Sequence, residues 1–196
     1  TSTTPTWTTG SSEFAAWELG EIRAGRRAGK QVFNWKTETW DTQFYVSEAY
    51  EVTRDTFGND KVEKYIFAGN QRVAMITSYP NMPPNPDAND LLYLHKDHLG
   101  STTVVTYEDG SLLPNTDKQA QYRAYGEEKH HSGFSLNTAT SYAFTDQEWD
   151  NSTGLYNYDA RLYNPEIGMF VTADTMLPDP YDPQQLNRFA YTRNNP

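Results

Sequence analysis

Cysteine is absent from the 196 residues, which excludes disulfide bonds, thiolate nucleophiles and zinc–thiolate sites. No apolar run approaches the ~18 residues of a membrane-spanning helix, so we expect no membrane span. Lys and Arg total 16 against 26 Asp and Glu, and the net charge of −10 argues against nucleic acid as a partner. Leu, Ile, Val and Phe are also scarce. Together they number 33 of the 196 residues, a share below the ~20% at which disorder becomes a serious interpretation.

Aromatic residues, in contrast, are abundant, with 14 Tyr, 9 Phe and 5 Trp. Disordered chains are poor in aromatic residues, so we predict an ordered chain of one domain or two small ones. The sequence begins without Met and shows no signal-peptide pattern. We therefore expect it to be part of a longer protein.

The first 40 residues give few structural signals. Residues 1–12 are rich in Thr and Ser and read as a tail. The apolar spacing of residues 13–24 predicts a short helix, which Gly20 weakens. A basic cluster then follows, which we interpret as a solvated loop. It is not a phosphate-binding loop, because Gln31 stands where Ser or Thr is required. Its members are Arg23, Arg26, Arg27 and Lys30.

From about residue 42 the sequence alternates with period two, which is typical of strands. Residues 44–49 and 62–68 flank a turn at 57–60, and residues 102–107 precede an Asp-Gly turn at 108–111. We predict further strands at 121–126 and 142–144, and a single strand over 155–163 after a turn at 150–154. Residues 80–90, which carry four prolines, read as a surface connection. The pattern predicts a mainly β array of hairpins with at most one or two short helices.

Four motifs in the last hundred residues resemble those of one family. Residues 93–102 (YLHKDHLGST) are similar to Y-x-H-x-D-H-L-G-S-T. Residues 144–150 (FTDQEWD) and 153–165 (TGLYNYDARLYNP) are similar to F-T-G-x-E-x-D and T-G-L-Y-x-Y-x-A-R-x-Y-x-P. Residues 168–174 (GMFVTAD) resemble G-R-F-x-S-x-D, and residues 186–196 (LNRFAYTRNNP) resemble L-N-R-Y-x-Y-x-x-N-N-P. This is the pattern of the Rhs/YD-repeat proteins, in their C-terminal Rhs-associated core.

The resemblance implies a strip of β-hairpins that forms part of a spiral shell, closed at one end by the Rhs core. It divides the chain into an unassigned segment (1–40), degenerate YD-repeat hairpins with the Pro-rich connection (41–90), and the core (91–196). The family includes Tc toxin C components, polymorphic Rhs toxins and wall-associated proteins. The implied partners are the remainder of the shell and a C-terminal effector, and the implied location is secreted or at the cell surface.

In toxin members, the core releases the effector by aspartate-dependent self-cleavage, which needs two neighbouring carboxylates. Asp174 matches the first carboxylate, although Thr175 and Met169 replace the usual Pro and Arg. The second belongs to a D-P-x-G segment beyond the N-N-P motif, and the sequence stops at Pro196. Asp179 and Asp182 each precede a proline, which favours turn chemistry over a local dyad. We therefore lean against an enzyme in this segment and keep Asp174 as the one candidate catalytic residue.

Other candidate sites are weaker, and we expect neither a metal nor a cofactor. His95 and His98 would point to opposite faces of a strand, and His130-His131 lie in a polar loop. Asp87, Asn89 and Asp90 lack the Gly and Glu of a calcium loop. A set of tyrosines is compatible with a carbohydrate site, but cross-strand packing is the favoured interpretation. Its members are Tyr122, Tyr125, Tyr142, Tyr156, Tyr158 and Tyr163.

Three functions are therefore compatible with the sequence. The leading hypothesis is a structural shell or plug segment that encapsulates or displays a C-terminal effector. The alternatives are a self-cleaving core that uses Asp174, and a module that binds cell-surface glycans. Upstream repeats would supply the packing surface that the few aliphatic residues cannot provide.

Overall fold

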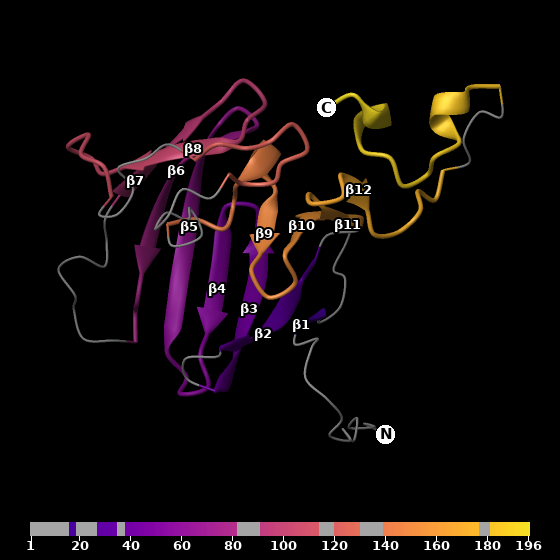
Figure 1. Ribbon diagram of the computed structural model, residues 1–196. Helices are drawn as coiled ribbons and strands as arrows, with labels where there is room; N and C mark the ends of the chain where they lie inside the picture. Colours follow the sequence, from indigo (N-terminus) through magenta and orange to yellow (C-terminus); the bar gives the residue numbers. More distant parts are fainter. Residues whose placement is uncertain are drawn as a thin grey trace, which may run out of the picture.

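The computed structural model describes residues 16–18, 27–34, 38–81, 91–113, 120–129, 139–176 and 181–196. These residues form two antiparallel sheets (Figure 1). Their only helices are three single turns of 3-10 helix, η2 (Phe144–Asp146), η3 (Pro183–Gln185) and η4 (Thr192–Asn194). No helix among them is long and apolar enough to cross a membrane. The predicted mainly β fold is confirmed.

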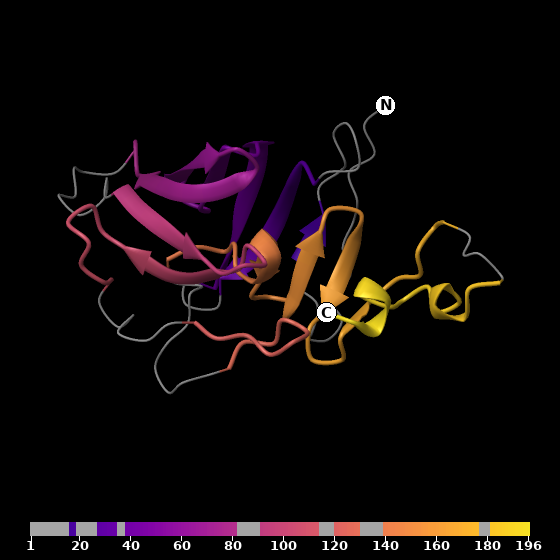
Figure 2. The ribbon, with the colours of Figure 1, turned by 90° about the horizontal axis from the view of Figure 1, so that it is seen from above.

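The larger sheet has eight strands that pair in sequence order. They are β1 (Ala16–Glu18), β2 (Gly29–Asn34), β3 (Thr39–Ser47), β4 (Tyr50–Arg54), β5 (Asp60–Ala68), β6 (Gln71–Ser78), β7 (Leu91–Lys96) and β8 (Thr102–Thr106). The smaller sheet has the order β12-β11-β10-β9, from β9 (Glu148–Asp150), β10 (Leu155–Tyr158), β11 (Arg161–Asn164) and β12 (Met169–Phe170). Seen from above, the larger sheet is bent, and η2 and β9 lie against its inner side (Figure 2).

Hairpin turns of one type recur along the chain. The carbonyl of Asp55 accepts a hydrogen bond from Gly58, and the Asp55 amide donates to Asn59. The same pair of bonds closes the turns at 97–101, 107–111 and 123–127, each with glycine in the fourth position. These glycines have φ between +81° and +86°, which other residues adopt only with strain. Turn chemistry that the sequence makes visible therefore sets the hairpin register.

The inner face of the larger sheet carries both apolar and charged side chains. One core cluster joins Tyr65, Met75, Leu94 and Val105 to Ala120 and Ala139. In the same face Glu51, Glu63 and Arg72 are also buried. The register places Tyr45 opposite Glu51 and Glu51 opposite Glu63, so these polar side chains form one row across three strands. Several apolar residues of the opposite face remain partly exposed, among them Trp40, Phe44, Ile66 and Tyr93.

The second core cluster is aromatic and belongs to the smaller sheet. Phe144, Tyr156, Tyr163 and Phe170 are buried there together with Ala143. Their rings meet at centroid distances of 5.5–6.1 Å where they contact directly, as in the Phe144–Tyr156 and Tyr163–Phe170 pairs. The scarcity of aliphatic residues is thus offset by ring packing, in which each pair adds about 0.5–1.5 kcal/mol beyond its buried area.

Four local predictions are wrong. Residues 121–126 are not a strand, because Tyr122 forms an isolated bridge with Glu128 and residues 123–127 form one of the recurring glycine turns. Residues 142–144 are not a strand either, because Tyr142 forms an isolated bridge with Glu148 and Phe144 begins η2. Residues 155–163 form a hairpin rather than one strand, because Asp159 adopts φ +54° in a two-residue turn that pairs Tyr158 with Arg161. Within residues 13–24, Ala16–Glu18 form strand β1 rather than a helix, because they pair with Lys30 to Val32 of β2. The remaining residues of 13–24 lie outside the described part, as do the whole Thr/Ser tail and most of the Pro-rich connection.

Candidate functional site

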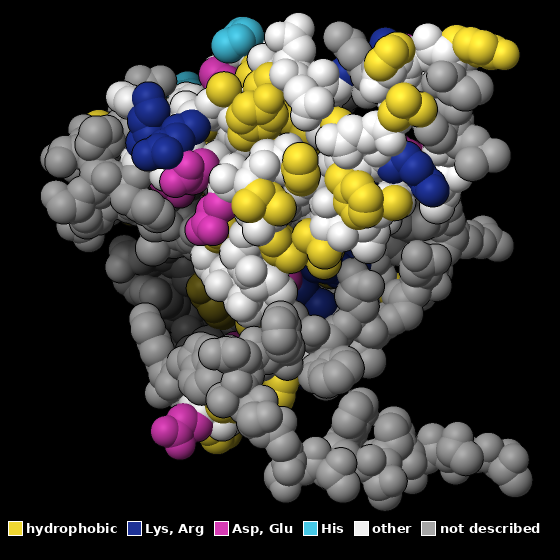
Figure 3. Space-filling model, turned by 45° about the vertical axis from the view of Figure 1, so that its right-hand side comes forward, with side chains coloured by type: hydrophobic (Ala, Val, Ile, Leu, Met, Phe, Trp, Pro, Cys, Tyr) yellow, Lys and Arg dark blue, Asp and Glu magenta, His cyan; other side chains and the backbone are white. Residues whose placement is uncertain are grey.

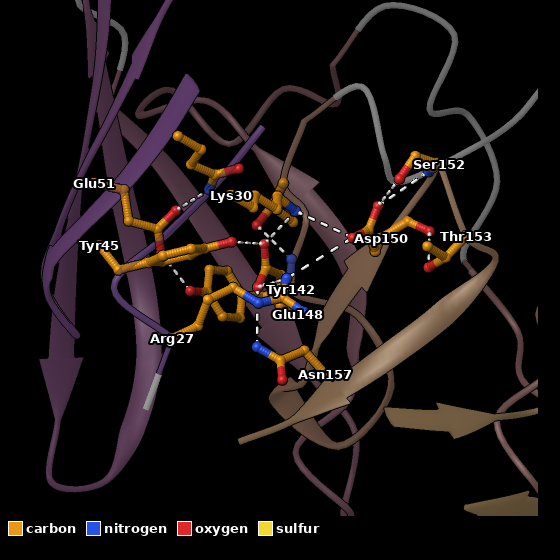
Figure 4. A network of polar contacts seen from close by, with 12 residues as sticks. Arg27, Lys30, Tyr45, Glu51, Tyr142, Glu148, Asp150, Ser152, Thr153 and Asn157 are labelled. Carbon is orange, nitrogen blue, oxygen red and sulfur yellow. Dashed lines mark hydrogen bonds and ion pairs between the residues drawn. The ribbon is translucent and has the colours of Figure 1, made fainter. Parts of the chain in front are cut away.

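The notable polar cluster of the molecule lies where the two sheets meet (Figure 4). Lys30 and Tyr45 reach it from β2 and β3, and Glu51 reaches it from β4. Glu148 enters from β9, and Tyr142 from the segment just before η2. The cluster therefore joins residues that lie about a hundred positions apart in the sequence, and we refer to it, with Arg27 and Asp150, as the inter-sheet network.

Glu148 is the centre of the inter-sheet network and is only 3% exposed. Its Oε1 accepts a hydrogen bond from Lys30 Nζ at 2.8 Å and another from the Tyr45 hydroxyl. Its Oε2 accepts from Asn157 Nδ2 at 3.3 Å and lies 3.8 Å from Arg27 Nη1. Burial, followed by the charge of Glu148, raises the pKa of Tyr45 above its ordinary value, so the hydroxyl remains a donor.

Asp150 is the second carboxylate that shares these cations. It lies 3.7 Å from Lys30 Nζ and 3.8 Å from Arg27 Nη1. Its Oδ1 accepts hydrogen bonds from the Ser152 amide and hydroxyl, at 3.0 and 2.6 Å. Burial alone would raise the pKa of Asp150, but Lys30 and the Ser152 hydrogen bonds outweigh burial and hold it below its usual value.

Glu51 has a different environment. It is 1% exposed and accepts hydrogen bonds from Gln43 Nε2 at 2.9 Å and from the Tyr142 hydroxyl. Burial raises its pKa to about 7; the Tyr142 hydrogen bond opposes this shift, and the charges of Glu148 and Glu63 add to it. Burial also raises the pKa of Tyr142 well above its ordinary value. Tyr142 therefore donates the hydrogen bond throughout the physiological range.

A second charged cluster lies beside the network, around Asp146 at the end of η2. Its carboxylate pairs with Arg72 Nη1 at 2.8 Å and with Lys96 Nζ at 2.6 Å, and both cations are almost fully buried. The Arg72 guanidinium carbon lies 3.3 Å from the Tyr142 ring centroid and 4.6 Å from that of Tyr65. Burial lowers the pKa of Lys96, although Asp146 opposes the shift. The two clusters together attach the η2–β9 segment to the larger sheet.

An open pocket of about 590 Å³ lies over these clusters. Its exposed rim carries Phe44, Glu48, Asn70 and Asp159, while Glu51 and Glu148 belong to its floor. Both floor carboxylates are at most 3% exposed, so they are too deeply buried to meet a dissolved substrate. The arrangement suits the joining of elements rather than acid–base chemistry on a ligand.

Asp174, the candidate catalytic residue, lies far along the chain from this network, after β12. Its Oδ2 is 3.0 Å from Arg161 Nη2, and its Oδ1 accepts a hydrogen bond from the Met176 amide at 3.0 Å. Arg188 donates to its backbone carbonyl. Asp182 is ion-paired with Arg193 at 3.5 Å, and Asp179 lies outside the described residues. The segment is thus held by two arginines of the recognised motifs.

The other candidates occupy separate places. His95 lies on β7 with a ring nitrogen 3.0 Å from Thr106 Oγ1, and His98 is exposed in the following turn. The described residues contain no group of three ligands that could hold a metal ion. Tyr156 and Tyr163 are 2% and 0% exposed, which agrees with the packing interpretation. Two of the weaker candidates lie outside the described residues: the pair His130-His131 and the set Asp87, Asn89 and Asp90.

Sequence reasoning did not identify the inter-sheet network. Glu148 and Asp150 are the E and D of the F-T-G-x-E-x-D pattern, and that match was the available signal for them. The sequence predicts a solvated loop for Lys30 and Arg27, whereas the structure buries both side chains against these carboxylates. No sequence pattern indicated Glu51.

Comparisons with known proteins agree with this architecture and define a class by its fold. The chain matches the crystal structure of TcdB2-TccC3-Cdc42 with a TM-score of 0.69 and 21% identity, over 93% of this chain and 9% of that chain. It matches a Photorhabdus luminescens Tc holotoxin pore with a TM-score of 0.72 and 21% identity, over 92% of this chain and 8% of that chain. The chain thus has the antiparallel β fold of a Tc toxin component.

Two curated proteins are similar in sequence. Salivary gland surface protein 1 of Aedes aegypti is 31% identical over 192 residues, which cover 91% of this chain and 5% of that protein. The tRNA3(Ser)-specific nuclease WapA of Bacillus spizizenii is 27% identical over 156 residues, which cover 78% of this chain and 6% of that protein. The chain therefore spans about a twentieth of these relatives. No family model matches the sequence.

Proposed function

We propose that the chain is a structural segment of an Rhs/YD-repeat shell that encloses or displays a C-terminal effector. The observation that carries the proposal is the bent eight-stranded sheet with a second sheet attached to its inner side, an architecture similar to that of TccC3 over about nine-tenths of the chain. Its buried charges attach one sheet to the other and are out of reach of a substrate. A secreted or cell-surface location belongs to the same proposal.

The exposed apolar side chains of the C-terminal part support a place in a larger assembly. Figure 3 turns this side forward and shows hydrophobic side chains spread across it. Ile167, Val171 and Leu186 are 50–63% exposed. Contact with further β-structure of the same shell would remove this surface from water. The implied partners are therefore the remainder of the shell and the enclosed effector.

Electron cryomicroscopy of the complete protein that contains these residues tests the proposal. We expect a hollow particle with the two sheets in its wall. We also expect a segment C-terminal to Pro196 to resist added protease in the native particle and to be digested after unfolding in urea. A solid particle, or a following segment digested equally fast in both states, would contradict the shell function.

Self-cleavage is the second proposal, because Asp174 occupies the position of the first carboxylate and is held in place by Arg161 and Arg188. In the complete protein, Asp174→Asn should leave one uncut chain on a denaturing gel, because the amide cannot act as a base. Asp182→Asn, which removes a carboxylate paired with Arg193, is the matched control and should be cut normally. Normal cleavage of the Asp174→Asn variant would show that Asp174 is not a catalytic carboxylate.

A further inference from the structure

Glu51 differs from the other buried carboxylates in its partners. Glu148 and Asp150 share Lys30 and Arg27, and Asp146 has Arg72 and Lys96. Within the part of the chain that the structure describes, Glu51 forms no ion pair. Its hydrogen bonds come from the neutral groups of Gln43 and Tyr142. Burial without a paired cation favours the protonated form of this carboxyl group, and the Tyr142 hydrogen bond opposes that preference only in part.

The groups that face Glu51 reinforce this preference. Glu63 is its cross-strand neighbour on β5, and Tyr45 is its neighbour on β3. Glu148 approaches from β9, and Arg72 from β6. Arg72 is the cation that acts on Glu51 directly, but its guanidinium is already engaged by Asp146 and by the rings around it. The charges of Glu148 and Glu63 thus oppose ionisation of Glu51, and Arg72 offsets them only in part.

We propose that Glu51 and Tyr142 form a proton-operated latch between the two sheets. The Tyr142 hydroxyl is the direct contact between β4 and the segment that leads into η2 and β9. While Glu51 carries a proton, the segment can bury it without leaving an uncompensated charge. When Glu51 loses the proton, the docked arrangement contains a buried negative charge, and separation of the segment from β4 returns that charge to water.

The direction of the pH effect follows from the raised pKa of Glu51, about 7 in the docked form against 4.5 in an exposed one. Below the lower value both forms are protonated, and docking has its full strength. Between the two values the docked form retains a proton that the open form has released, so each pH unit favours opening by up to about tenfold. Above about pH 7 both forms are ionised, and the effect levels off.

Hydrogen exchange of the Thr102 amide measures this opening, because Thr102 on β8 donates to the Ala143 carbonyl at 3.0 Å, a bond that joins the larger sheet to the segment that carries Tyr142. After correction for the intrinsic exchange rate, we expect its protection factor to fall by about tenfold or more between about pH 5 and about pH 7.5. Glu51→Gln should give a pH-independent protection factor. Glu48→Gln, an exposed residue on the adjacent turn, is the matched control and should retain the wild-type profile.

Carboxyl carbon NMR of Glu51 in the unmodified protein gives a test that needs no variant. The Glu51 signal should titrate about two pH units above those of exposed glutamates. Tyr142→Phe removes the hydrogen bond that favours the ionised form, so its opening transition should move to higher pH, which a merely structural contact would not produce. Titration of Glu51 together with the exposed glutamates, or the same pH profile in Glu51→Gln, would overturn the latch.

Discussion

Asp146 shows how one residue can serve both backbone and charge. It occupies the glycine position of the F-T-G-x-E-x-D pattern and, like a glycine there, has a positive φ of +59°. Asp tolerates this left-handed conformation better than most residues. Its carboxylate then supplies the counter-charge for Arg72 and Lys96, which are 5% and 4% exposed at their side chains. The replacement of the pattern's glycine by Asp146 thus adds ion pairs from η2 to Arg72 on β6 and to Lys96 on β7.

Asp146→Asn should lower the free energy of unfolding by about 2–4 kcal/mol, because it leaves two buried cations without an anion while preserving side-chain shape. Urea unfolding at neutral pH measures the change. Asp159→Asn is the matched control, since Asp159 has a φ of +54° but is exposed, and we expect a loss below about 0.5 kcal/mol. Equal losses in the two variants would show that backbone strain, not the ion pairs, determines the role of Asp146.

At the scale of elements, the glycines of the recurring turn differ in how closely other residues pack against them. A Cβ on Gly110 would contact nothing within 4 Å, whereas one on Gly126 would lie 2.4 Å from the Phe144 ring. Both residues have a positive φ, of +81° and +86°. The turn at 123–127 is therefore a packing element as well as a connection, since its glycine permits Phe144 to fill the aromatic cluster.

Gly110→Ala should cost about 1–2 kcal/mol from backbone strain alone. Gly126→Ala should cost about 1–3 kcal/mol more, because Phe144 must move out of a packed cluster. Thermal unfolding of the two variants side by side gives the difference. If both melt at the same temperature, the ring has room to shift and the packing argument is wrong.

The elements that the sequence predicted are those specified by local chemistry. The Gly-containing turns at 57–60 and 108–111 and the β-branched run before the second of them are visible in single short segments. The first turn joins β4 to β5 as predicted, and the second follows β8 and closes an isolated bridge between Thr106 and Leu112. The turn at Asp159 was missed because no glycine marks it. Which face of each strand points inward also could not be read, because Glu63 and Tyr65 are buried while Ile66 is exposed. Alternation predicts two faces but does not say which one the second sheet covers.

At the scale of the whole molecule, the inter-sheet network is a long-range structure. The bond from Lys30 to Glu148 spans 118 residues, and the bond from Tyr45 to Glu148 spans 103. No local pattern can predict such pairs, although the matched motif contained Glu148. The sequence therefore predicts Lys30 as a member of a solvated basic cluster, whereas in the structure it is a buried cation that joins the two sheets.

Lys30→Met should weaken the attachment of the smaller sheet by about 3 kcal/mol, because Glu148 and Asp150 then share only Arg27, which lies 3.8 Å from each. Trp149 lies on β9, so its fluorescence during urea unfolding, measured in a background where the other four tryptophans are replaced by Phe, reports the detachment. Lys61→Met is the control, because Lys61 is 41% exposed in its pair with Glu63 and should cost below about 1 kcal/mol. A similar loss in both variants would mean that the network does not join the sheets.

The separation of Lys30 from Glu148 also constrains the order in which the protein can assemble during synthesis. The larger sheet is complete once residue 106 has left the ribosome, but the carboxylates that neutralise Lys30 and the segment that covers Glu51 come some forty residues later. Until then, water must solvate the inner face of the nascent sheet. We expect the polar row on this face to keep the larger sheet from packing against other structure during translation, until β9 is synthesised and its carboxylates pair with Lys30.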